Sequence, residues 1–271
     1  MSQSCKNSYK IMQKIKKQIT NNLIMVRPEH FDFNNETAEN NHFQKKEKKL
    51  SKEKILRNAK NEFDNLYNKL IKNKINVNVF NDRKKVRTTD SVFPNNWISL
   101  HQDGSVYVYP MFSENRRKER RFDIIEMLKK QFEIKRVIDL SYFEKESVFL
   151  EGTGSMILDR QNKICYAALS DRTNIIALND FCNRTLYNPI TFNSYQKVEG
   201  KINLICHTNV MMCVADQYAI VCLETIHDKK EREVLISSLE KTNKEIIEIS
   251  DCLLYTSDAA DEGLGVDLGG R

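Results

Sequence analysis

Glycine is scarce in this sequence until its last nine residues. Of the 8 glycines in 271 residues, four precede Ser250 and the other four fall at positions 263, 265, 269 and 270. No Gly-x-Gly-x-x-Gly follows a predicted strand, so a dinucleotide-binding fold has no support. Lysine, which is frequent up to Ser250, is absent from residues 252–271. The tail therefore differs in composition from the rest of the chain.

Long apolar runs are also absent. No run approaches the roughly 18 residues that a membrane-spanning helix needs, so the sequence predicts no membrane partner. The first twenty residues lack the apolar core of a secretory signal, but they are basic and free of acids, and Ile11, Ile15 and Ile19 share one helical face. We interpret residues 1–21 as a solvated basic extension, with a mitochondrial presequence as the alternative.

Paired cysteines are missing as well. The 7 cysteines form no C-x-x-C pair and no metal-finger spacing. The sequence therefore predicts no metal site, and no motif in it implies a cofactor. An odd number of cysteines without a secretion signal indicates a reducing compartment, so we expect a cytoplasmic protein.

The net charge of +6 comes largely from residues 45–60, KKEKKLSKEKILRNAK. A nucleic-acid site would need interleaved aromatic side chains or a recognisable binding module, and neither is present. Glu47, Glu53 and the helical spacing that follows are typical of a solvated helix face. The sequence therefore predicts no nucleic-acid partner.

Helical and strand-like patterns alternate along the chain. Apolar residues have helical spacing within residues 53–73, 120–132, 174–186 and 230–242. Strand-like stretches lie at residues 23–28, 75–80, 105–111, 136–141, 148–159, 164–170, 202–214, 218–224 and 245–250. This order predicts a single α/β domain of repeated units of similar size, with no linker.

Four polar clusters interrupt the strand-like stretches: DSVFPNNW (90–97), EGTGS (151–155), SDRTN (170–174) and HTN (207–209). Glu151 places a carboxylate at a strand end, where Gly152 and Gly154 would let the backbone pass close to a ligand. On a continuous strand, His207 and Asn209 would point to the same face of an apolar wall, as a binding site requires. Taken singly, each is better explained as a strand-end acid or a hydrogen-bonded core histidine.

The cysteines near these clusters are poor candidates for a nucleophile. Adjacent strand residues face opposite sides, so Cys206 and His207 would not point into one cleft. Cys165 and Cys222 lie in apolar strand patterns, which are typical of buried structural thiols. Arginine is the side chain that grips a carboxylate with two hydrogen bonds, and Arg172 lies just past a strand.

In this order the clusters resemble those of the amidinotransferase and arginine-deiminase superfamily, most closely its citrulline-utilisation hydrolases. The resemblance spans residues 22–250 and includes MVRPEHFDFNNETAENNHFQ (25–44), DSVFPNNWISLHQDGSVYVYPMFSENRRKERR (90–121), FLEGTGSMILDR, YAALSDRTN and CHTNVMMCV. It implies a pseudo-fivefold α/β propeller of ββαβ units around a central cavity that binds a small amino-acid substrate. Whether the protein forms a homo-oligomer is left open by the sequence.

The resemblance also implies a covalent mechanism. A cysteine thiolate attacks the carbon of a guanidino or ureido group, a histidine protonates the departing nitrogen, and water then releases the intermediate. By motif, His207 is the acid/base, and Glu151 is the acidic partner that orients the histidine or holds a substrate nitrogen. The implied substrate contacts are Arg172 with either Arg116 or Arg117 for the α-carboxylate, and Asp90 for the α-amino group.

Two positions depart from the arginine deiminases, which carry aspartates where this chain has Asn96 and Asn209. Both asparagines would lie in the substrate cavity. Amides in place of carboxylates remove two negative charges there, which suits a neutral ureido group better than a cation. We therefore predict citrulline as the substrate ahead of arginine.

In this superfamily the nucleophilic cysteine lies near the C-terminus, in a glycine-rich segment. Nothing after Ser250 resembles that segment, and CLLYTSDAADE is instead similar to translated sequencing adapter. We expect residues 251–271 to be a non-native tail, the last propeller unit and the nucleophile to be missing, and the chain to be inactive. An amidinotransferase and a non-catalytic ligand-binding relic are the two alternatives.

Overall fold

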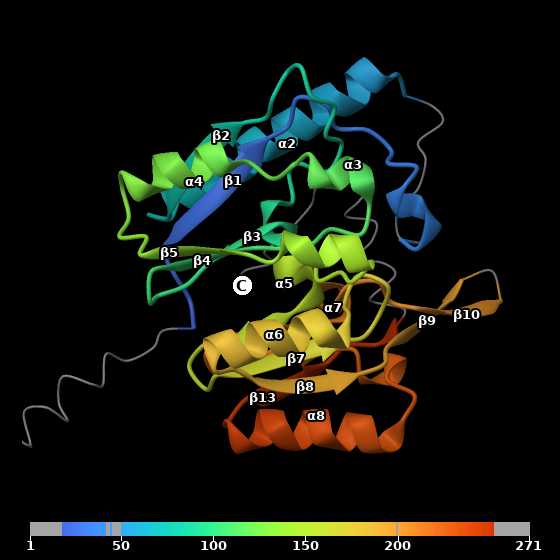
Figure 1. Cartoon of the computed structure of the whole chain (residues 1–271). Helices are drawn as coiled ribbons and strands as arrows, with labels where there is room; N and C mark the ends of the chain where they lie inside the picture. Colours follow the sequence, from blue (N-terminus) through green and yellow to red (C-terminus); the bar gives the residue numbers. More distant parts are fainter. Residues whose placement is uncertain (1–17, 42–43, 45–49, 199, 252–271) are drawn as a thin grey trace, which may run out of the picture.

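The computed structural model describes residues 18–41, 44, 50–198 and 200–251 (Figure 1). The predicted basic extension and the predicted tail lie outside these ranges, apart from residues 18–21 and Asp251, and so do residues 45–49 of the basic run. The expectations about both termini therefore stay predictions. Among the described helices, none combines the length and the hydropathy of a membrane span.

Three segments of the chain share the order strand, strand, helix, strand. They are β3 (Ile98–Leu100), β4 (Ser105–Val108), α4 (Phe122–Lys129) and β5 (Arg136–Asp139); β6 (Ile157–Asp159), β7 (Ile164–Ala168), α6 (Ile175–Thr185) and β8 (Asn188–Phe192); and β11 (Met212–Val214), β12 (Tyr218–Val221), α8 (Lys229–Lys241) and β13 (Glu245–Glu248). In each segment the first two strands are antiparallel, and the second and last strands are parallel. The predicted α/β alternation is confirmed as three ββαβ units.

A fourth unit at the start of the described chain has one strand fewer. It comprises β1 (Asn22–Arg27), α2 (Lys52–Lys72) and β2 (Asn76–Asn81), and its two strands are parallel, with Asn22 opposite Asn76. A separate antiparallel hairpin, β9 (Tyr195–Val198) and β10 (Lys201–Leu204), follows β8. Closure into five units stays a prediction.

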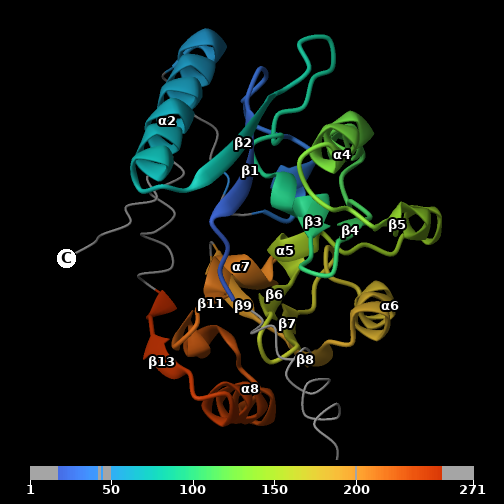
Figure 2. The same cartoon turned by 90° about the vertical axis from the view of Figure 1, so that its left-hand side faces the viewer.

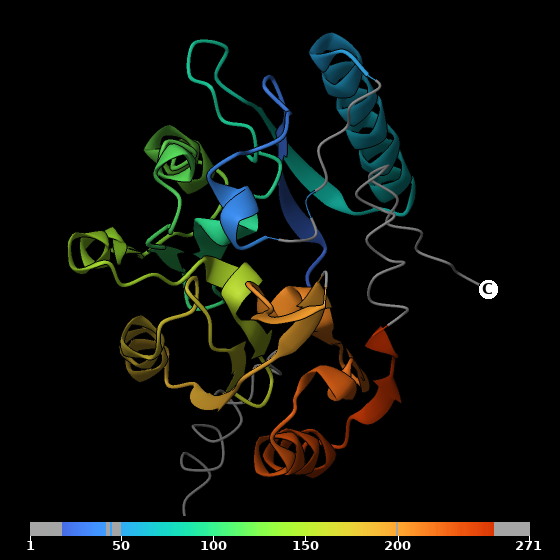
Figure 3. The same ribbon diagram turned by 90° about the vertical axis from the view of Figure 1, so that its right-hand side faces the viewer.

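Three very short helices lie at the centre, and the long helices lie at the rim (Figures 2 and 3). They are the 3₁₀ helix η2 (Pro94–Asn96), α5 (Gly152–Ser155) and α7 (Thr208–Met211). Each precedes the first strand of one complete unit, and α5 contacts both of the others. This repeated position brings together polar clusters that are about 60 residues apart in sequence.

The long helices each bury one apolar face against a sheet, as their spacing predicts. Ile124, Ile125 and Leu128 of α4 are buried, and so are Leu235 and Leu239 of α8. Burying one such side chain stabilises the fold by roughly 1.5–3 kcal/mol. The rim helices therefore hold the sheets in place around the short central helices.

Two strand-like stretches differ from the prediction. Residues 148–159 contain α5 before β6, and residues 202–214 contain α7 between β10 and β11. Thr208 and Met211 of α7 are buried, so a single helical turn here has the same apolar composition as a strand. A continuous strand is thus wrong at both places, and the turns reorient the polar residues that precede them.

Gln18 joins two of the units near the start of the described chain. Its Nε2 donates to the carbonyl oxygens of Leu158 (2.8 Å) and Val214 (3.1 Å), which belong to β6 and β11. Its Oε1 accepts from the backbone N–H of Arg160 at 2.6 Å. The folded part of the chain therefore begins before residue 22, the predicted start of the domain.

Candidate active site

Glu151 and His207 form a hydrogen-bonded pair at the centre of the molecule. Each is the residue that immediately precedes a one-turn helix, α5 for Glu151 and α7 for His207. His207 Nε2 lies 2.7 Å from Glu151 Oε2. Glu151 is fully buried, and the His207 residue is only 9% exposed. The structure brings together two residues that motif alone placed in one site.

The surroundings of this pair favour an ionised carboxylate and a neutral imidazole. Burial alone would raise the pKa of Glu151, but Arg172, the hydrogen bond from His207 and Arg116 together hold it well below its ordinary value. Burial lowers the pKa of His207, and the two arginines act in the same direction against the effect of Glu151. The Nε2–H of His207 therefore donates to Glu151, and Nδ1 is the nitrogen left to exchange a proton.

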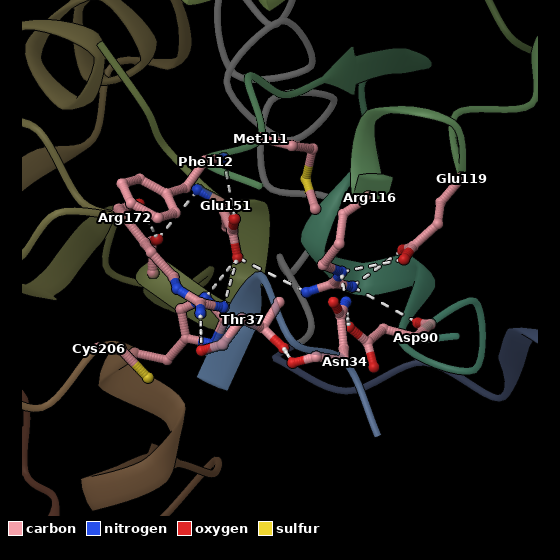
Figure 4. A network of polar contacts seen from close by, with 12 residues as sticks. Asn34, Thr37, Asp90, Met111, Phe112, Arg116, Glu119, Glu151, Arg172 and Cys206 are labelled. Carbon is pink, nitrogen blue, oxygen red and sulfur yellow. Dashed lines mark hydrogen bonds and ion pairs between the residues drawn. The ribbon is translucent and has the colours of Figure 1, made fainter. Parts of the chain in front are cut away.

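Two buried arginines approach the same carboxylate oxygen from opposite sides (Figure 4). Glu151 Oε2 lies 3.6 Å from NH1 of Arg116 and 3.5 Å from NH1 of Arg172. Arg116 belongs to the short helix α3 (Glu114–Arg117), and Arg172 lies in the loop before α6. Both predicted carboxylate-binding positions thus belong to one cluster with Glu151 and His207.

Arg116 has two further acidic neighbours. Glu119 accepts two hydrogen bonds from it, to Oε1 from Nε at 3.0 Å and to Oε2 from NH2 at 2.9 Å. Asp90 Oδ2 lies 3.6 Å from Nε, as expected for a residue predicted at this site. Burial raises the pKa of Glu119 to about 7, because it outweighs the opposing effect of Arg116. Glu119 was not predicted from the sequence.

Arg172 is held by the segment that contains the 3₁₀ helix η1 (Thr37–Glu39). Its Nε donates to Asn40 Oδ1 at 3.0 Å, and its NH2 donates to that oxygen and to the carbonyl of Thr37 at 3.1 Å. The Phe112 ring lies 5.9 Å from its guanidinium carbon. Asn34 of the same segment donates to Asp90 Oδ2 at 2.5 Å. Residues 34–40 therefore cover one side of the cluster.

Arg117 lies outside the cluster. Its guanidinium donates to the backbone carbonyls of Met111 (3.0 Å) and Phe112 (3.2 Å). The backbone N–H of Phe112 in turn donates to Glu151 Oε1 at 3.0 Å. Arg117 thus supports the chain segment behind Glu151, and Arg116 is the arginine that reaches the carboxylate.

From the sequence, the two glycines of EGTGS were expected to let the backbone pass close to a ligand. In the structure they allow other segments of the protein to approach closely. A Cβ atom on Gly152, which has φ of +46°, would lie 2.2 Å from the carbonyl oxygen of Asn95. A Cβ on Gly154 would lie 3.2 Å from Asn96 Nδ2 and from His207 Nδ1 and Cε1. Asn96 is buried beside this glycine, next to the histidine.

Asn209 does not share a face with His207. It lies within α7 and is exposed, whereas His207 is buried before the helix begins. The prediction of a common strand face is wrong, because the helical turn replaces the alternation of a strand with a period near 3.6 residues. The amide of Asn209 therefore does not affect the charge of the cluster around Glu151.

The described cysteines are poor candidates for a nucleophile at this site. Cys206 is 4% exposed, burial raises the pKa of its thiol, and its sulfur points away from Glu151 (Figure 4). Cys165, Cys182 and Cys222 are buried free thiols in the hydrophobic core. Within the described ranges, no group of three or more His, Cys, Asp or Glu side chains is placed to hold a metal ion.

A second histidine is largely buried elsewhere. Ser99 Oγ lies 2.8 Å from His101 Nε2 and 2.6 Å from the Tyr109 hydroxyl. Burial lowers the pKa of His101 to about 3. No ion pair of the kind made by His207 involves this ring among the described residues, so it has no comparable partner for acid/base chemistry.

Solved structures of low sequence identity share this fold. A cysteine-to-serine mutant of the N-terminal domain of ArgZ, an arginine dihydrolase from the ornithine–ammonia cycle in Cyanobacteria, was determined bound to substrate; it has a TM-score of 0.63 at 16% identity over 87% of this chain and 78% of that chain. AgrE in complex with L-arginine has a TM-score of 0.63 at 16% identity over 85% of this chain and 31% of that chain. A dimethylarginine dimethylaminohydrolase adduct with S-methyl-L-thiocitrulline has a TM-score of 0.56 at 15% identity over 87% and 78%.

No curated protein sequence matches the chain. A family model does, and it covers most of the described domain, including all four polar clusters. The matched residues are 27–256, and the chain belongs to the family of eukaryotic N,N-dimethylarginine dimethylhydrolases.

Proposed function

We propose that the protein hydrolyses the terminal C–N bond of a guanidino amino acid, with N-methylated arginine as the first candidate and arginine as the second. The family name and the ligands of the similar structures support this choice of chemistry. The net charge of the buried cluster is the observation that carries it.

With Glu119 ionised, the form favoured by the two hydrogen bonds that it accepts from Arg116, the cluster contains one more negative than positive charge. Its carboxylates are Asp90, Glu119 and Glu151, its guanidinium groups are Arg116 and Arg172, and His207 is neutral. The zwitterionic head group of an amino acid adds no net charge, and a guanidinium adds one positive charge. Binding a guanidino amino acid therefore neutralises the cluster, whereas citrulline would leave a buried negative charge uncompensated, which is costly.

This charge balance replaces our prediction of citrulline. That prediction depended on two amides in the cavity, and the exposed position of Asn209 leaves only Asn96 there. One amide is outweighed by the three carboxylates of the cluster. We accordingly rank citrulline behind both cationic substrates.

His207 is the proposed acid/base, and Glu151 orients it. Because Nε2–H is donated to Glu151, Nδ1 would first take the proton of the nucleophile, pass it to the departing amine and later take another from the attacking water. The ionised carboxylate stabilises the imidazolium that forms in the first step.

The substrate head group would lie between the two arginines. Arg116 and Arg172 provide donors for the α-carboxylate, and Asp90 provides an acceptor for the α-amino group. The carboxylate would replace Asn40 on Arg172, since Asn40 Oδ1 now accepts from both Nε and NH2 of that side chain. Binding thus requires residues 34–40 to shift.

The presence or absence of a nucleophile decides between a hydrolase and a protein that only binds the ligand. The resemblance calls for a cysteine thiolate, and a similar ArgZ structure is covalently bound to a reaction intermediate. Cys206 is a poor candidate because its thiol is buried and has a raised pKa, and Cys252 lies outside the described residues. A protein that binds the ligand without turnover is therefore the second candidate.

Calorimetry and product analysis on the same preparation test the proposal. We would titrate asymmetric dimethylarginine, L-arginine and L-citrulline, and assay citrulline, dimethylamine and ammonia. Binding of the cationic ligands with product supports the hydrolase, and binding without product supports the second candidate. Tighter binding of citrulline than of both cationic ligands would exclude the charge argument. Transfer to an added amine in competition with water would identify an amidinotransferase.

A further inference from the structure

Glu119 holds the Arg116 guanidinium on the side away from Glu151 (Figure 4). Its two oxygens accept parallel hydrogen bonds from Nε and NH2 at 3.0 and 2.9 Å. Such a forked pair fixes the plane of the guanidinium as well as its position. NH1 is the nitrogen left over, and it lies 3.6 Å from Glu151 Oε2.

The ion pair between Arg116 and Glu119 is almost completely shielded from solvent. The Arg116 side chain is 4% exposed and the Glu119 side chain is 1% exposed. Surface pairs three residues apart serve mainly to support a helix, but α3 ends at Arg117 and Glu119 lies beyond it. Burying two charges is costly and requires close partners. This pair therefore has a purpose other than holding α3 together.

Without Glu119, Arg116 would have two other carboxylates within reach. Asp90 Oδ2 and Glu151 Oε2 each lie 3.6 Å from one of its nitrogens, slightly too far for a hydrogen bond. A guanidinium released from Glu119 would close on one of them and lose its free donor. Glu119 thus keeps NH1 near the catalytic pair without letting it bind tightly there.

We infer that Glu119 is a positioning residue, which holds Arg116 so that its remaining donor receives the carboxylate of the ligand. This inference rests on the proposed function, because it assumes an amino-acid ligand in the cluster. It extends that function to a residue that makes no contact with the ligand.

A pair of ligands that differ only in the carboxylate tests the inference. L-arginine and agmatine carry the same guanidinium, but agmatine has no carboxylate. We would measure dissociation constants for both with the wild type, Glu119→Gln, Glu119→Asp and the control Glu114→Gln. Glu114 lies in α3 with Arg116, but its side chain is 85% exposed.

Glu119→Gln is expected to weaken L-arginine binding roughly 10- to 100-fold and agmatine binding less than about threefold, because truncating a buried charged partner affects only contacts made through Arg116. Glu119→Asp keeps the charge and should recover part of the loss. Glu114→Gln should match the wild type. Thermal melting of each variant establishes that it is folded.

Three results would overturn the inference. An equal loss for both ligands would show that Glu119 is only structural, and no loss for either would show that Arg116 needs no support. A wild type that binds neither ligand would refute the proposed function together with the inference. If Glu119→Gln does not fold, Glu119→Asp decides the question, since equal weakening of the two ligands by that variant also counts against us.

Discussion

His207 Nε2 and Glu151 Oε2 meet at 2.7 Å although 56 residues separate them in sequence. Both residues occupy the same position in successive units, directly before a one-turn helix and the first strand. The repeated architecture therefore places an acid and a base side by side. Their pairing makes the electrostatics of the cluster directly testable.

Replacing His207 with Asn should separate binding from catalysis. The imidazole is the proposed proton carrier, so turnover should fall at least ~100-fold, whereas ligand affinity should change only a few-fold because both arginines remain. Steady-state rates and calorimetry on one preparation measure the two effects. His227→Asn is the matched control, because that ring is exposed and stacks on Tyr195. An equal loss of binding and turnover would argue against the assigned role.

Glu151→Gln should destabilise the fold. The substitution removes the negative charge that Arg116, Arg172 and His207 share in a fully buried position. Breaking a buried ion pair on one side costs about 3–5 kcal/mol, because the remaining charge is left without a partner. Urea unfolding at pH 7.5 measures the change. A loss below about 1 kcal/mol would show that the carboxylate is not needed to balance the arginines.

Gly154→Ala should disturb the histidine with only moderate loss of stability. The added methyl would lie 3.2 Å from His207 Nδ1 and Cε1 and from Asn96 Nδ2. Overpacking of this kind costs roughly 1–3 kcal/mol, and turnover should fall because the ring is displaced.

Gly200→Ala provides the comparison for Gly154→Ala. Gly200 has φ of +83° and open space around it, so the substitution carries only a backbone cost. We expect both variants to melt at lower temperature, but only Gly154→Ala to lose activity. Unchanged turnover in Gly154→Ala would mean that the ring tolerates the displacement.

His101 should make the protein sensitive to acid. Its pKa is about 3 in the folded state against an ordinary 6.5, so between these values the unfolded chain takes up a proton that the folded protein does not. Stability therefore falls as pH decreases below 6.5, by up to ~1.4 kcal/mol per pH unit.

His101→Gln should reduce this dependence. The free energy of unfolding should drop between pH 7.5 and pH 5.0 by about 1–2 kcal/mol less in this variant than in the wild type. His227→Gln, at an exposed position, should behave like the wild type. Identical pH dependence in all three proteins would show that His101 does not titrate in this way.

The long elements of the fold were predictable, and the short central ones were not. Four helices were predicted from an apolar face repeated over two or more turns, and the structure confirms each to within a few residues. A single turn such as α5 or α7 has no measurable period, and the apolar residues Val210 and Met211 made α7 look like a strand. Only the three-dimensional contacts reveal those turns.

The same distinction applies to the site. Glu151 and His207 could be assigned by motif, and the structure brings them into contact. Glu119 and Asn40 could not, because RRKERR has the composition of a solvated surface and residues 34–40 contain no catalytic pattern. Their importance depends on burial by segments that are distant in sequence. The chemistry of a single residue does not predict such burial.

The position of Gln18 limits how the protein can be matured or trimmed. Removal of the residues ahead of Gln18 would leave its hydrogen bonds to β6, to β11 and to Arg160 just beyond β6 intact. A cut after Gln18 would remove the only side chain among the described N-terminal residues 18–21 that bridges both strands. Shortened versions made for crystallisation should accordingly keep Gln18.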